Sequence, residues 1–104
     1  MRSEVLKGNV DVLLLAAVRN GEAHGYGIVE TVRSCSEGAF DLAEGTVYPA
    51  LHRLERQGLL ESRWHEVAGR RRRLYRLTDR GRDALAERRE EWTAFSRAMQ
   101  AVLG

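Results

Sequence analysis

The feature that most constrains this chain is a segment, Asn9 to Arg19, that is apolar on nearly every side of a helix. Its apolar residues are Val10 and every position from 12 to 18. Such a helix must be buried on more than one face. A buried strand is the competing interpretation, but the length and the alanines favour a helix ended by Asn20-Gly21. A chain of 104 residues can bury one core but not two, so we expect one compact domain, and its 43% of hydrophobic residues is typical of a globular protein.

Two further helices are predicted in the first half of the chain. One runs from about Gly25 to Ser34, and the polar residues after it, 34–38, indicate a loop. The other begins with Thr46 as N-cap and ends at Gly58, a residue favoured after a helix C-terminus. Pro49 falls in its first turn, where the missing N–H has no partner to lose. Each helix has an apolar stripe for the core: Ile28, Val29 and Val32 in the first, and Val47, Leu51 and Leu54 in the second.

A β-hairpin is predicted next. Residues 59–66 and 71–77 mix apolar and polar side chains with a period near two, and Gly69 supplies the turn between them. Tyr75 and Leu77 would share one face of the second strand, and arginines would occupy the other. The tip of this hairpin is therefore expected to be basic.

A long final helix is predicted from Thr78-Asp79 to the C-terminus, with Thr78 as N-cap. This helix carries an a/d heptad stripe, which Arg88 interrupts. We expect the stripe to have a role in dimerisation. The stripe consists of Leu85, Trp92, Phe95, Met99 and Val102. The order of elements is typical of a mainly α (α+β) winged helix-turn-helix. Residues 1–78 would form the DNA-binding region, and residues 79–104 the C-terminal dimerisation helix of one compact domain.

Charge is distributed unevenly along the chain. The formal net charge is only +2, but six arginines and one acid lie between Arg63 and Arg76. Such a cluster indicates an anionic partner, nucleic acid first, although a solvated basic face would look the same by charge alone.

Several classes of protein are disfavoured. The longest apolar run, residues 12–18, is too short for a membrane span, and no secretory signal is recognised, so we expect a cytoplasmic protein without a membrane partner. Cys35 is the single cysteine, and an inert thiol is a commoner role for it than a redox switch. The three histidines show no metal-ligand spacing, so no metal or cofactor is expected. No acid, base and nucleophile set indicates an enzyme.

Several stretches of this sequence resemble PadR-family transcriptional regulators, from about Lys7 to Leu103. The most specific stretch is Glu44–Leu60, EGTVYPALHRLERQGLL. Supporting stretches are Lys7-Gly8-Asn9, His24–Ile28 (HGYGI), Gly69–Thr78 (GRRRRLYRLT) and Arg80-Gly81. The resemblance implies a homodimeric, operator-binding repressor of the short type, with a single C-terminal helix for dimerisation.

The candidate DNA contacts lie on the third helix and on the hairpin, or wing. Hydroxyl groups suit phosphate oxygens, and His52 and Arg53 suit base edges or backbone. Strand alternation sends the wing arginines to both faces, so two or three of the four would contact DNA, in the minor groove or at phosphates. The full candidate set is Lys7, Thr46, Tyr48, Pro49, His52, Arg53, Arg70, Arg71, Arg72 and Arg73.

The last helix offers a second candidate site. In some small PadR relatives an aromatic ligand enters a pocket at the dimer interface, and Trp92 matches by position the tryptophan that lines it. A plain dimer core is the simpler interpretation of the same stripe, and Arg88 and Arg89 depart from a flat apolar slot. The effector-pocket residues would be Val12, Leu15, Trp92, Ser96 and Met99.

The sequence thus predicts a sequence-specific DNA-binding transcriptional regulator, a homodimeric repressor released by a small aromatic effector. The alternative is a winged-helix protein-interaction module without DNA binding. A metal sensor with ligands assembled across the dimer is a further variant.

Overall fold

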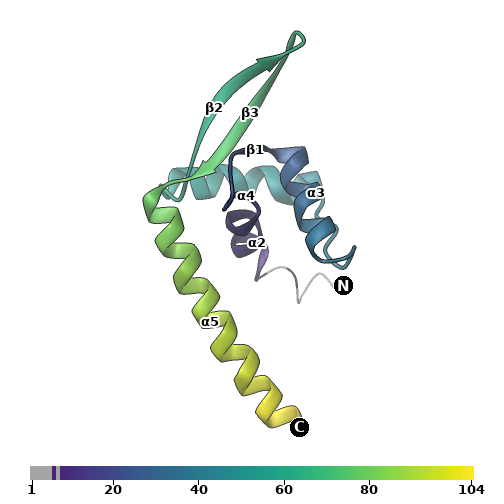
Figure 1. Ribbon diagram of the computed structural model, residues 1–104, viewed down its shortest axis with the longest axis vertical. Helices are drawn as coiled ribbons and strands as arrows, with labels where there is room; N and C mark the ends of the chain where they lie inside the picture. The colour runs from purple at the N-terminus through teal and green to yellow at the C-terminus, as the bar shows by residue number, and fades with distance from the viewer. Residues whose placement is uncertain (1–5, 7) are drawn as a thin grey trace.

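The computed structural model describes residue 6 and residues 8–104, and they form a winged helix-turn-helix (Figure 1). The described elements, in chain order, are α2 (Val10–Ala17), β1 (Ala23–His24), α3 (Gly25–Cys35), α4 (Glu44–Arg56), β2 (Leu60–Val67), β3 (Arg70–Leu77) and α5 (Asp79–Leu103). The fold class is α+β, as predicted. No helix in the described part of the chain combines the length and apolar character needed to cross a membrane.

Helix α2 is at the centre of the core, as its composition predicts. Leu14 and Leu15 are completely buried, and Val10 and Val18 nearly so. The helix packs against α3, α4 and α5. It ends at Ala17, earlier than expected, with Val18 as C-cap.

Helix α4 begins at Glu44, so the prediction that Thr46 is its N-cap was wrong. The carbonyl of Ala43 accepts the first helical bonds, from the N–H groups of Thr46 and Val47 at 2.9 and 3.0 Å. No side chain caps this end. Pro49 consequently lies in the second turn rather than the first, where it withholds the N–H that would have bonded to the Gly45 carbonyl.

Strands β2 and β3 form the predicted hairpin. Their register pairs Leu60 with Leu77 at one end and Val67 with Arg70 at the other. The two turn residues, Ala68 and Gly69, have φ of 52° and 79°, which suits a type I′ turn. A third strand, β1, pairs with the other edge of β3 and was not predicted, because two residues are too few to show alternation.

The junction between the wing and α5 is tightly fixed. Thr78 caps α5 as predicted, since its Oγ1 accepts from the Gly81 N–H at 3.0 Å. The same hydroxyl donates to the Gly58 carbonyl at 2.6 Å. Gly81 and Leu85 are buried, whereas the C-terminal part of α5 extends away from the body of the molecule, opposite to the wing (Figure 1).

Candidate nucleic-acid interface

Helix α4 divides cleanly into a buried and an exposed face. Its core residues, Val47, Leu51 and Leu54, are completely buried, as predicted. The candidate DNA contacts on this helix are all exposed: Thr46, Tyr48, Pro49, His52 and Arg53. The helix therefore presents a polar surface to solvent, opposite its apolar packing face.

The four wing arginines point alternately to the two faces of β3. The strand register places Arg73 opposite Trp64, and Arg71 lies on the same face two residues away. Arg70 and Arg72 therefore lie on the other face. Arg70, Arg71 and Arg72 are exposed, whereas Arg73 is only partly exposed.

Arg73 is an anchor between the wing and α4. Its Nε donates to Ser62 Oγ at 2.7 Å, and that hydroxyl donates to Glu55 Oε2 at 2.6 Å. Arg73 Nη2 also lies 3.6 Å from Glu55 Oε2. Since Glu55 belongs to α4, this network fixes the wing relative to the helix and engages one of the four arginines.

Trp64 is a wing residue that the sequence analysis missed. The guanidinium carbons of Arg71 and Arg73 lie 4.6 and 5.2 Å from its ring centroid. These are cation–π distances, and the indole is still 54% exposed. The signal was present in the hairpin register, which places Trp64 beside the arginine run.

A groove of about 490 Å³ separates α4 from the wing. Tyr48 and His52 line it on the α4 side, and Trp64 and the four arginines line it on the wing side. Tyr75 and the first residues of α3 complete it. The structure thus brings six candidate residues together around one hollow, while Thr46, Pro49 and Arg53 do not line it.

At one end of this groove, His24 connects α3 to the wing. Its Nδ1 accepts from the Gly27 N–H at 3.1 Å, which caps α3, and its Nε2 lies 2.8 Å from Arg72 Nη1. Burial, and then the charge of Arg72, lower the pKa of His24 from its usual 6.5. With Nδ1 accepting, a neutral ring carries its proton on Nε2, so Nε2–H and the Arg72 guanidinium are two donors that lie next to each other.

Arg53 is paired within the protein rather than free. Its Nη2 lies 2.5 Å from Asp11 Oδ1, a carboxylate of α2. The remaining candidate contact, Lys7, lies outside the described residues.

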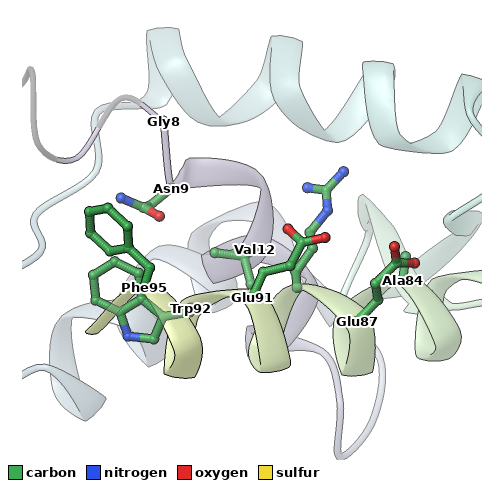
Figure 2. A pocket seen from close by; sticks show the side chains of 9 residues that line it. Gly8, Asn9, Val12, Ala84, Glu87, Glu91, Trp92 and Phe95 are labelled. Atoms are coloured by element: carbon green, nitrogen blue, oxygen red, sulfur yellow. The ribbon is translucent and has the colours of Figure 1, made fainter. Parts of the chain in front are cut away.

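Two hollows lie between α2 and α5. The larger, about 860 Å³, has both acidic and aromatic walls, and Figure 2 shows the Phe95 ring beside Asn9 with the Trp92 indole beneath it. The smaller, about 310 Å³, is mostly apolar and includes Phe40. Val12 and Trp92 line both.

The predicted effector pocket is thus only partly assembled in one chain. Leu15 is completely buried and lines neither hollow, because its side chain packs into the core. Ser96 and Met99 lie farther along α5 and line neither.

The apolar stripe of α5 is exposed beyond its first turns. Trp92, Phe95, Met99 and Val102 are 52%, 55%, 44% and 86% exposed, and Trp92 and Phe95 stack at 5.7 Å. Leu85 is only 6% exposed and packs inside a single chain, so it is not part of this surface. Among the described residues, no cluster of three His, Cys, Asp or Glu side chains is placed to hold a metal ion.

Comparisons with known proteins agree with this architecture. The chain is 38% identical to transcriptional regulator Rv3488 of Mycobacterium tuberculosis over 101 residues, which are 97% of this chain and 89% of that protein. A transcriptional regulator from Clostridium thermocellum superposes with a TM-score of 0.87 at 30% identity, over 96% of this chain and 95% of that one.

A second similar structure is Bacillus subtilis PadR in complex with operator DNA. It shares the fold with a TM-score of 0.69 at 24% identity, over 75% of this chain and 45% of that one. The model of the transcriptional regulator PadR-like family matches residues 14–87, which include the second half of α2, the wing and the first turns of α5. This chain therefore belongs to the PadR-like family of transcriptional regulators.

Proposed function

We propose that this regulator binds duplex DNA sequence-specifically, with α4 in the major groove and the wing along the backbone. The observation that carries the proposal is the groove between α4 and the wing, where aromatic and hydroxyl groups face a run of arginines. Cations and hydroxyl donors suit phosphate oxygens, and a helix presenting His and polar groups suits base edges. The operator complex of the similar Bacillus subtilis PadR supports this choice of partner.

We propose DNA contacts for exposed side chains, and a supporting role for Arg73, which is bonded within the protein. Thr46, Tyr48, Pro49 and His52 would lie against DNA from α4. Arg70, Arg71 and Arg72 would contact phosphates or the minor groove, with Arg73 holding the wing in place. His24 Nε2–H and Arg72 present two donors that one phosphate oxygen would satisfy. Lys7 stays a predicted phosphate contact.

We further propose that two copies pair through α5, so that residues 1–78 carry DNA binding and residues 79–104 carry dimerisation. An exposed apolar stripe on a projecting helix needs a cover, and a two-fold axis would bring the same stripe from both copies together. The pair would hold two α4 helices about one DNA turn apart, roughly 34–36 Å.

As a repressor, the dimer would release DNA when a small aromatic effector enters beside Trp92. Val12 and Trp92 would contact it within one chain, and Ser96 and Met99 would complete the pocket only with the partner. Such an effector works by binding one arrangement of the two α4 helices more tightly than the other.

The test is fluorescence anisotropy on the DNA upstream of the protein's own gene and on random duplex, at two salt concentrations. Arg71→Ala with Arg72→Ala should weaken binding to both duplexes and reduce the salt slope by about 1.8, or about 0.9 for each phosphate that is no longer neutralised. The control, Arg82→Ala with Arg97→Ala, removes the same charge from exposed positions on α5. An equal weakening in both double variants would contradict the wing contacts. Wild-type protein with no salt-dependent binding would favour the protein-interaction alternative.

A further inference from the structure

One carboxylate joins three helices of this chain. Asp11, on α2, directs Oδ1 to Arg53 Nη2 on α4 at 2.5 Å. Its other oxygen, Oδ2, lies 3.9 Å from Arg88 Nη1 on α5. The Asp11 side chain is only 23% exposed, so both arginines reach it at the edge of the core. These residues are 42 and 77 positions apart in sequence from Asp11, and only the fold brings them together.

The two arginines share this carboxylate unequally. Arg53 makes a close ion pair, whereas Arg88 stands at the outer limit for one. The trio carries a net charge of +1, so one carboxylate cannot neutralise both guanidinium groups. A displacement of α5 that brought Arg88 nearer would weaken the hold of Asp11 on Arg53, and a displacement away would strengthen it.

Arg53 is also the residue for which Asp11 and DNA compete. Its side chain is 46% exposed on the polar face of α4, beside the groups proposed to contact DNA. If a phosphate does not come close to Arg53, exchanging the Asp11 carboxylate for that phosphate adds little to the free energy of DNA binding. When α4 fits its site on DNA, a phosphate or base edge lies close to Arg53. That contact is stronger than the ion pair with Asp11, so the guanidinium moves from Asp11 to DNA.

We propose that Asp11 withholds Arg53 from loosely fitting DNA and that Arg88 sets how firmly it does so. Asp11 is thus a specificity-determining residue that acts through Arg53 and does not touch DNA. The proposal rests on the proposed function and adds a route by which the position of α5 affects α4.

The experiment measures anisotropy on a random duplex across a salt series, with Asp11→Asn as the first variant. Freeing Arg53 should tighten binding about three- to eightfold near 0.1 M salt and steepen the salt slope by about 0.9, the value for one more neutralised phosphate. The control is Asp41→Asn. It changes the net charge equally, but Arg33, which Asp41 contacts at 2.6 Å, keeps its ion pair with Glu30. We expect less than about a twofold change from it.

Variants that also change Arg53 or Arg88 separate this role from a structural one. In an Arg53→Ala background, Asp11→Asn should no longer tighten binding. Arg88→Ala leaves Asp11 to Arg53 alone and should weaken random-duplex binding, but only while Arg53 is present. Arg88→Ala, compared with and without Arg53→Ala, tests the proposal even if Asp11→Asn folds poorly.

The outcomes are distinguishable. Tightening that depends on Arg53 supports the proposal. Equal effects of Asp11→Asn and Asp41→Asn, or tightening that persists without Arg53, overturn it while leaving DNA binding intact. Wild-type protein without salt-dependent binding to any duplex overturns the proposed function, and the inference with it.

Discussion

His24 holds the N-terminus of α3 with a nitrogen that must stay unprotonated. Its pKa is lowered in the folded chain by burial and by Arg72, so between that value and about 6.5 the unfolded chain binds more protons. The free energy of unfolding therefore rises with pH through this window and falls as the pH drops below about 6.5. His24→Asn keeps a capping side chain without the titration. Urea unfolding at about pH 7.5 and about pH 5.5 should show a smaller decrease in the variant, and an equal decrease would contradict this role.

Trp64 is expected to orient Arg71 for DNA, since the Arg71 guanidinium lies 4.6 Å from its ring centroid. Trp64→Ala should weaken duplex binding about two- to fivefold, the equivalent of one cation–π contact. Trp64→Phe should retain most of the affinity, because it keeps an aromatic face. Stability should change little, since the indole is half exposed. Anisotropy titrations of the three proteins check this, and unchanged affinity in Trp64→Ala would remove Trp64 from the interface.

Single residues also show where sequence reasoning stops. The core positions Val47, Leu51 and Leu54 follow from helical spacing alone, and all three are buried. The start of α4 does not, because Ala43 caps it by its backbone and no residue type marks that. The Arg53–Asp11 pair is likewise invisible in sequence, since it depends on how α2 packs against α4.

At the scale of elements, Gly81 fixes the wing against α5. A Cβ on Gly81 would lie 2.0 Å from the Leu59 carbonyl oxygen, a backbone atom that cannot turn aside. Gly81→Ala should lower the free energy of unfolding by about 1–3 kcal/mol, as overpacking does. Gly45→Ala is the matched control, because a Cβ there meets nothing within 4 Å, and it should stabilise α4 by up to about 1 kcal/mol. Denaturant unfolding measures both, and similar changes in the two variants would contradict the clash.

Elements with a strong local pattern were predictable, and elements made by tertiary pairing were not. The hairpin was visible because alternation and Gly69 agree, and Thr78 marks the start of α5 as the structure has it. Strand β1 exists only because Ala23 and His24 meet the free edge of β3. The groove between α4 and the wing could not be predicted from the sequence for the same reason, since the pairing of β1 with β3 positions its α3 end.

For the whole molecule, the heptad pattern and the single-chain structure assign different roles to the two ends of one stripe. Leu85 fits the heptad as well as Phe95 does, yet only Leu85 is buried by its own chain. The heptad pattern indicates that a side chain is buried. Only the structure shows whether the same chain buries it or leaves it for a partner. We therefore expect the proposed dimer contact to lie in the projecting part of α5, from Trp92 onward.

Phe95→Asp tests that contact. Since Phe95 is 55% exposed in one chain, a charge there should leave the folded protomer intact but place two carboxylates at a two-fold interface. Sedimentation should show a dimer for the wild type and a monomer for the variant. Ala94→Asp, exposed on the same helix but off the heptad stripe, should remain dimeric. DNA binding by the monomeric variant then distinguishes contacts within one protomer from the effect of pairing. The monomer should keep the α4 and wing contacts of one half-site but lose those of the second. Its affinity for a two-half-site operator should fall at least about tenfold, while its affinity for a single half-site stays unchanged.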